Sequence, residues 1–326
     1  MTFYKNILGS AYQMTKKHKF LWLFGFFVVL LGENGGEYEF YIRHTQKLFQ
    51  EDNIFNPYFW LTSRWEVLYN QITSFVAATG VLGYFLLFIL ALALLLVIYF
   101  VMVSQASIVK TTDLAANNKK VSLFASISLV RKKVFSILGL NIILKGIIYT
   151  VFLLIGLPLL SLIASSGNQD YFTLYLILGF VILFPIIIVS SFLTKYAINF
   201  IVLKEEKFLS SIVKAWKLFI KNWLITLEMA LVIFVLNIAI SLLIIVLLFV
   251  VLSPFLYFSI LNSNTLVSSA PLAAFLYIVP IIVIALIALV GSMFSAFQWS
   301  AWTILFDSLV REPKQARILG WIKRKK

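Results

Sequence analysis

The sequence predicts an all-α fold, a polytopic membrane helical bundle in which residues 1–326 form one integral membrane domain. Composition is the first reason: 62% of the residues are hydrophobic and 12% are charged, against roughly 45–50% and about 25% in soluble domains. The second reason is that the segments 67–109, 146–169 and 229–306 contain no charged residue. A helix needs about 20 apolar residues to cross a bilayer, so the first two segments hold at least one span each and the third holds two.

Six transmembrane helices are expected in total. Their approximate ranges are 19–36, 74–103, 136–163, 171–194, 223–252 and 273–306. The segment 33–70, after the first span, is the longest polar stretch and is expected outside the cell, where its aromatic residues would dock at the membrane surface. The alternative is that this segment forms a cap that binds a partner.

The first span is the shortest, because its apolar centre, from Phe20 to Gly32, has only 13 residues. That length also suits the apolar core of a cleaved signal peptide. However, no A-x-A-like cleavage site follows, since "LLGENGGEYEF" leads directly into acidic and polar residues. Lys16, Lys17 and Lys19 can snorkel to make up the missing length. We therefore expect a retained membrane anchor rather than a signal peptide.

The distribution of basic residues predicts the orientation of the spans. Twenty-three lysines and arginines lie in the amino terminus, in the segments 104–133 and 195–221, and in the tail after residue 310, whereas the external segments hold three. Such an excess marks the cytoplasmic side, so both termini are expected in the cytoplasm and the protein in the cell (plasma) membrane. The net charge of +14 is spread over these short segments instead of one soluble face, and no nucleic-acid partner is expected.

Three segments that lead into outward spans share a plan: 3–24, 121–140 and 206–227. In the third, apolar residues fall on one helical face (Phe208, Ile212, Trp216, Phe219 and Trp223) and basic residues on the opposite face (Lys214, Lys217 and Lys221). A basic amphipathic helix suits the cytoplasmic headgroup region, with anionic membrane lipids as partners. The pattern indicates a pseudo-threefold repeat of interfacial helix, outward span and inward span. The alternative is that the three segments are similar without a true repeat, since any apolar helix flanked by lysines shows part of this pattern.

The stretch "KYAINFIVLKEEKFLSSIVKAWKLFIKNW", residues 195–223, resembles a family of bacterial six-span membrane proteins. That family includes the membrane domain attached to some glycerophosphodiester phosphodiesterases. The resemblance covers most of the chain and implies a six-span architecture. In the fused members the hydrolase is a separate soluble barrel with His, Glu and metal-binding residues, and His18 and His44 do not stand in its motif. The resemblance therefore implies no phosphodiesterase activity.

Two charged residues, Lys145 and Glu228, lie inside expected spans. An unpaired charge in the bilayer costs at least about 2.5 kcal/mol. Both spans run outward, and at 1.5 Å of rise per residue the two depths differ by about 6 Å, which a lysine side chain can reach across. The sequence therefore predicts that the two residues pair or share a wet cavity, with Asn141 and Gln298 as further lining. Alternatively, Lys145 snorkels, Glu228 lies near the interface, and neither binds a ligand.

The sixth span also carries a ridge of small residues. Ala288, Ser292, Ala296 and Ser300 follow one another at four-residue spacing. Small residues on one ridge allow helices to approach closely, so we expect a helix–helix contact there rather than a pore lining.

No catalytic or metal-binding motif in the sequence rises above chance: Ser-x-x-Lys occurs at Ser107/Lys110 and Ser211/Lys214, as often as random placement of these residues would give. It has no cysteine and two histidines, so no thiolate or His-based metal site and no cofactor are expected. Gly-x-Ser-x-Gly, phosphate-binding loops and His-Glu zinc motifs are missing. We expect a multi-pass protein without enzymatic activity that interacts with lipid or organises the membrane. The alternative is a transporter or permease-like subunit that uses the region of Lys145 and Glu228.

Overall fold

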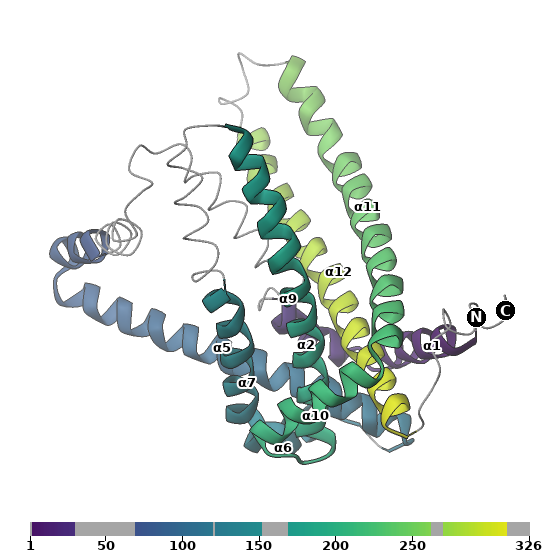
Figure 1. Cartoon of the computed structure of the whole chain (residues 1–326). Helices are drawn as coiled ribbons and strands as arrows, with labels where there is room; N and C mark the ends of the chain where they lie inside the picture. The colour runs from purple at the N-terminus through teal and green to yellow at the C-terminus, as the bar shows by residue number, and fades with distance from the viewer. Residues whose placement is uncertain (1, 30–68, 120, 152–168, 262–269, 312–326) are drawn as a thin grey trace.

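The computed structural model describes residues 2–29, 69–119, 121–151, 169–261 and 270–311, and these residues are helical apart from short connections (Figure 1). The α-helices in chain order are α1 (Thr2–Lys17), α2 (Phe20–Val29), α5 (Val81–Ala116), α6 (Leu123–Val130), α7 (Val134–Val151), α9 (Gln169–Leu203), α10 (Phe208–Lys221), α11 (Trp223–Leu261) and α12 (Ala270–Arg311). A 3-10 turn, η1 (Arg131–Lys133), joins α6 to α7, and residues 69–79 are also helical. The all-α prediction is confirmed for the described residues.

Five helical stretches are long and apolar enough to cross a membrane: Val81–Ala116, Leu123–Val151, Val181–Leu203, Trp223–Ser253 and Ile281–Arg311. They overlap the second to sixth predicted spans, and the chain is a multi-pass helical membrane protein. At the position of the first predicted span, α2 is a shorter apolar helix of 10 residues. The rest of that span, and nearly all of the predicted external segment 33–70, lie outside the described residues.

Three times along the chain, a short helix precedes an apolar one: α1 before α2, α6 before α7 and α10 before α11. A returning helix, α5, α9 or α12, follows each of these pairs. Every short helix packs against the returning helix of another pair, since α1 contacts α12, α6 contacts α5 and α10 contacts α9. Ala11, Ser126 and Ala215, one in each short helix, are completely buried. Small residues at these positions allow the helix backbones to approach closely.

The core lies where the three returning helices meet. α5, α9 and α12 contact one another pairwise, and their buried side chains concentrate in the ranges 101–112, 190–202 and 292–309. The halves of α5 and α12 that precede these ranges expose large apolar side chains, for example Phe88 and Ile284. In Figure 1, α9, α11 and α12 run in similar directions, whereas α5 crosses them obliquely. Apolar surface of this extent on a folded chain marks a region that faces lipid.

α2 and α12 approach each other very closely. A Cβ atom added to Gly25 of α2 would lie 1.9 Å from the carbonyl oxygen of Ser292 and 3.1 Å from the amide nitrogen of Ala296. Ser292, Ala296 and Ser300 are all buried, and the Ser300 hydroxyl accepts a hydrogen bond of 3.1 Å from Thr112 of α5. The ridge of small residues predicted in the sixth span therefore forms a helix–helix contact, as expected.

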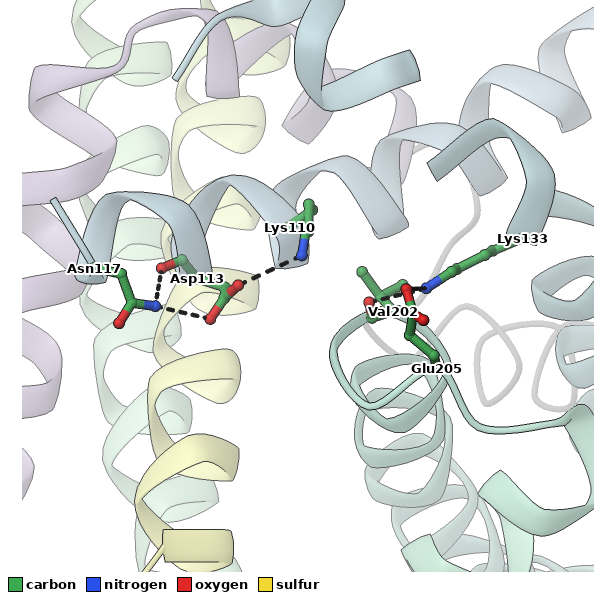
Figure 2. A network of polar contacts seen from close by, with 6 residues as sticks. All are labelled: Lys110, Asp113, Asn117, Lys133, Val202 and Glu205. Atoms are coloured by element: carbon green, nitrogen blue, oxygen red, sulfur yellow. Dashed lines mark hydrogen bonds and ion pairs between the residues drawn. The ribbon is translucent and has the colours of Figure 1, made fainter. Parts of the chain in front are cut away.

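α5 continues as a helix beyond residue 103, where the second span was predicted to end, as far as Ala116. Its last turn is held by Asp113, which pairs with Lys110 at 3.6 Å and accepts a hydrogen bond of 3.1 Å from the Asn117 amide (Figure 2). Asn118 then adopts a φ of 54°, a left-handed conformation that asparagine tolerates and that commonly ends helices. The helix thus ends at a backbone signal, not where hydropathy falls.

The end of α9 is tied to the start of α7 (Figure 2). The Lys133 ammonium of η1 donates a hydrogen bond of 3.2 Å to the carbonyl oxygen of Val202 and pairs with Glu205 at 3.3 Å. A lysine near the carboxyl end of a helix satisfies a free carbonyl and complements the helix dipole. Glu205 has a φ of 56°, which turns the chain out of α9 before α10 begins.

Candidate functional site

A small cavity with both polar and apolar side chains in its lining lies between α7 and α9. Lys145 and Asn141 of α7 line it together with Ser190, Ser191 and Thr194 of α9, and its volume is about 40 Å³. A cavity of this size has room for about one or two water molecules. The two predicted site residues of α7 thus lie together, among hydroxyl groups that the sequence did not single out.

Asn141 is the most buried residue of this cavity and links α7 to α5. Its exposed fraction is 4%, and its amide nitrogen donates hydrogen bonds of 3.1 Å to Gln105 and 3.0 Å to the Ile137 carbonyl oxygen. Its side-chain oxygen, in contrast, is buried without a hydrogen-bond partner among the described residues. A buried acceptor of this kind is ordinarily satisfied by bound water.

Lys195 adds a second cation close to the cavity. It is only 8% exposed, and its ammonium donates a hydrogen bond of 2.7 Å to Ser191, one of the cavity-lining residues. The same ammonium lies 6.0 Å and 5.8 Å from the ring centroids of Trp299 and Trp302 in α12. Cation–π contacts of this length stabilise a buried lysine. The predicted fourth span ends at residue 194, just before Lys195, whereas α9 continues to Leu203 and Lys195 lies in its packed part.

Glu228 and Gln298, the other two predicted site residues, do not line this cavity. Glu228 lies near the start of α11 at 9% exposure, and its carboxylate accepts a hydrogen bond from the Tyr4 hydroxyl of α1. Gln298 is 8% exposed on α12. Whether Lys145 and Glu228 pair stays a prediction. The structure adds Tyr4 to the surroundings of Glu228, a contact that joins the amino terminus to the fifth predicted span.

The three lysines predicted for the interfacial helix, Lys214, Lys217 and Lys221, are exposed on α10. Lys214 forms an ion pair with Glu206, in the connection from α9, and Glu206 also accepts a hydrogen bond of 2.9 Å from Ser210. The hydrogen bond from Lys214, followed by that from Ser210, lowers the pKa of Glu206 below its usual value.

The apolar residues of α10 divide into two faces. Phe208, Ile212, Leu218 and Phe219 pack against the core of the bundle. A separate stripe remains exposed at i, i+4, i+7 and i+11 spacing: Leu209, Val213, Trp216 and Ile220, with exposed fractions from 46% to 67%. Trp216, which the sequence places on the apolar face of this helix, belongs to the exposed stripe, whereas Phe208 and Ile212 of the same predicted face pack against the core. α10 therefore presents apolar side chains and lysines together to its surroundings.

Hydroxyls, amides and two ammonium groups around the cavity can hold water or a small anion by hydrogen bonds. Within the part of the chain that the structure describes, no three His, Asp or Glu side chains gather into a metal site.

Comparison with known proteins adds no family. No protein-family model, no curated protein and no solved structure matches the chain. Of what the family resemblance implies, the structure supports the general architecture, a helical protein with several membrane spans.

Sequence reasoning missed Lys195, its tryptophan neighbours and the contact between Tyr4 and Glu228. One signal was present for Lys195: it stands within the apolar run "SSFLTKYAINFIVL", with no other charged residue from 171 to 203. A charge inside an apolar helix usually has a specific partner. No comparable signal exists for Tyr4, because 224 positions separate it from Glu228.

Proposed function

We propose that this multi-pass membrane protein is not an enzyme and that it interacts with lipid, or organises the membrane, at the cytoplasmic face of the cell membrane. The observation that carries the proposal is the outer surface of α10. Its exposed stripe (Leu209, Val213, Trp216 and Ile220) lies beside three exposed lysines. Helices with apolar and basic surfaces side by side lie in the headgroup region, with the lysines toward anionic lipids.

The order of the helices supports the accompanying topology. We propose six spans, as in the bacterial six-span family that the sequence resembles. Both termini lie in the cytoplasm, and the chain is built as three modules related by a pseudo-threefold repeat. Three short helices each precede an apolar helix and a returning helix, and the contacts of α1 with α12, α6 with α5 and α10 with α9 follow one cyclic rule. A repeated sequence plan and a repeated packing rule are independent reasons for this arrangement.

A label on α10 tests the lipid interaction, and the natural lack of cysteine makes a single label possible. The protein is reconstituted in lipid nanodiscs with a fluorescent thiol probe on Val213→Cys. We expect quenching by lipids that carry a quencher on the acyl chain and protection from a water-soluble quencher. The control is the same probe on Asn117→Cys, an exposed position at the polar end of α5. Equal access of the water-soluble quencher to both positions would refute the proposal.

The topology has a separate test in whole cells. Single cysteines at Ser166 and Asn262, which lie outside the described residues, should react with an impermeant thiol reagent added from outside. A cysteine at Asn117 should react only after the membrane is opened. External labelling of Asn117→Cys in sealed cells would overturn the orientation.

A second candidate function is a transporter or permease-like subunit, and the buried polar group around Lys145 and Lys195 favours it. Transport requires that this site be reached from both sides of the membrane in turn. Ser190→Cys should then react with small water-soluble thiol reagents from either side of sealed vesicles; reaction from one side or neither excludes transport through this site.

The exchange Lys145→Glu with Glu228→Lys tests the predicted pair, which requires that the double variant regain folded protein lost in each single variant.

A further inference from the structure

We propose that a groove between α1, the start of α2, α11 and α12 binds one anionic phospholipid. This inference rests on the lipid-interacting function proposed above and names a site and a headgroup charge for it. The groove has a volume of about 570 Å³, which lies within the range of roughly 300–1,000 Å³ typical of small-molecule sites. Its surface combines two features that an amphipathic anion requires, a cationic rim and apolar walls.

The cationic rim consists of Lys16, at the end of α1, and Lys19, just before α2. Both side chains are exposed, and the Lys16 ammonium lies 6.0 Å from the ring centroid of Tyr12, which also lines the groove. Among the described residues neither lysine takes part in an ion pair, and the groove lining includes no acidic residue. The rim therefore has two positive charges to offer an anionic headgroup.

The walls of the groove are apolar and come from two membrane-spanning helices. α11 contributes Leu236 and Ile240, and α12 contributes Val290, Met293, Phe294 and Phe297. No charged residue lies on these walls, so they suit an acyl chain and offer nothing to a soluble anion. The pairing of such walls with a lysine rim favours a lipid over free phosphate or another small anion.

The rim is held in place relative to the walls. The indole nitrogen of Trp22 donates a hydrogen bond of 3.1 Å to the carbonyl oxygen of Thr15, and both residues line the groove. This bond fixes the turn between α1 and α2, on which Lys16 and Lys19 lie. α1 itself packs against α12 through a face that includes the buried residues Ala11 and Thr15. A site that is already ordered loses less entropy on binding.

The walls also lie where lipid can reach them. Around Leu236, the α11 side chains of Leu231, Phe234 and Val235 are more than half exposed, so one face of this part of the helix is open to its surroundings. In a bilayer such a surface meets acyl chains. A phospholipid can therefore enter the groove sideways from the surrounding leaflet, with its headgroup toward the lysines.

The first test uses the full chain in nanodiscs that contain equal amounts of phosphatidylglycerol and phosphatidylcholine. Lipids that stay bound after release into the gas phase are counted by native mass spectrometry. We expect one retained phosphatidylglycerol, and a loss of its preference over phosphatidylcholine in Lys16→Gln with Lys19→Gln. A lysine near an anionic headgroup is worth about fivefold in affinity, about 1 kcal/mol, so the double variant should lose on the order of 25-fold. The matched control, Lys119→Gln with Lys132→Gln, changes two exposed lysines that lie outside both the groove and α10, and it should keep the preference.

A second variant tests the walls without changing the charge. Ile240→Trp adds bulk inside the groove and should abolish retention of the bound lipid while both lysines remain. The melting temperature of each variant, measured without added lipid, separates loss of the site from loss of the fold. Unchanged selectivity in the lysine variant, or unchanged retention in the tryptophan variant, would overturn the proposal.

The outcomes distinguish this site from the broader function. If α10 is embedded in the headgroup region but the groove variants retain lipid as the wild type does, the site fails and the lipid-interacting function stands. If the Val213 probe is exposed to water while the groove variants lose lipid, the groove is a lipid site and the interfacial role of α10 fails. A wild-type protein that retains no phosphatidylglycerol in preference to phosphatidylcholine overturns the groove directly.

Discussion

Gly25 offers the sharpest test of the packing between α2 and α12. In Gly25→Ala, the new methyl carbon would lie 1.9 Å from the Ser292 carbonyl oxygen, whereas ordinary contact begins at 3.4 Å. Relief therefore requires a separation of about 1.5 Å between the two helices, since the obstacle is backbone and has no rotamer to change. Leu21, Phe24 and Val28, which are buried on the same face of α2, would lose contacts when the helices part.

The expected cost can be estimated from known core substitutions. An added methyl group in a well-packed core costs about 1–3 kcal/mol, and the close approach to backbone here argues for the upper end, about 3 kcal/mol. That corresponds to a change of roughly 100-fold in the unfolding equilibrium. We expect Ser292→Gly to give no rescue, because the clashing atom belongs to the backbone.

The measurement is equilibrium unfolding of the purified protein in mixed detergent micelles. The matched control is Gly291→Ala in α12, where an added Cβ would meet nothing within 4 Å. There we expect no loss and a gain of up to about 1 kcal/mol, because alanine restricts the unfolded chain. A Gly25→Ala protein within 0.5 kcal/mol of the wild type, or a control equally destabilised, would contradict the reasoning.

Three further predictions concern polar contacts. Tyr4→Phe removes a hydrogen bond to a buried carboxylate of α11 and should lower the free energy of unfolding by about 1.5–3 kcal/mol, whereas Tyr12→Phe, at a residue that is 60% exposed, should change it little. Thr112→Val breaks the buried hydroxyl contact between α5 and α12 and should cost about 1 kcal/mol in the same unfolding assay. Because the pKa of Glu206 is lowered, its ion pair with Lys214 should persist at neutral pH and be lost only as the pH falls through that depressed pKa. Carboxyl NMR should therefore show Glu206 titrating at higher pH in Lys214→Gln, and an unchanged titration would contradict the assignment.

Much of the architecture could be read from local properties of the sequence. Hydropathy over windows of about 20 residues located five helices, since the transfer of a segment into lipid depends mainly on that segment's own side chains. The predicted span 223–252, for instance, begins where α11 begins, at Trp223. The ridge that contains Ser292 and Ala296 could also be predicted from the sequence, because four-residue spacing places small side chains on one face of any helix.

Only part of the candidate site could be predicted from the sequence. Lys145 and Asn141 were predicted to lie together because they are one helical turn apart, and both line the cavity. A count of basic residues does not say where a helix ends, and the sequence therefore predicts Lys195 just beyond the span 171–194. α9 continues to Leu203, and the lysine is consequently enclosed by Ser191 and two tryptophans of α12.

By itself, the sequence determined that the chain is a membrane protein, that it is helical, and roughly where its spans begin. Those properties follow from the solvation of each segment taken alone. Only the tertiary structure decided which helices meet. It places Gly25 against Ser292 and Tyr4 against Glu228. It also leaves a stripe of apolar residues on α10 exposed and opens a groove beside Lys16 and Lys19. These depend on contacts between segments far apart in the chain, and in a sequence where nearly every helix is apolar, hydrophobicity cannot say which partner each one takes.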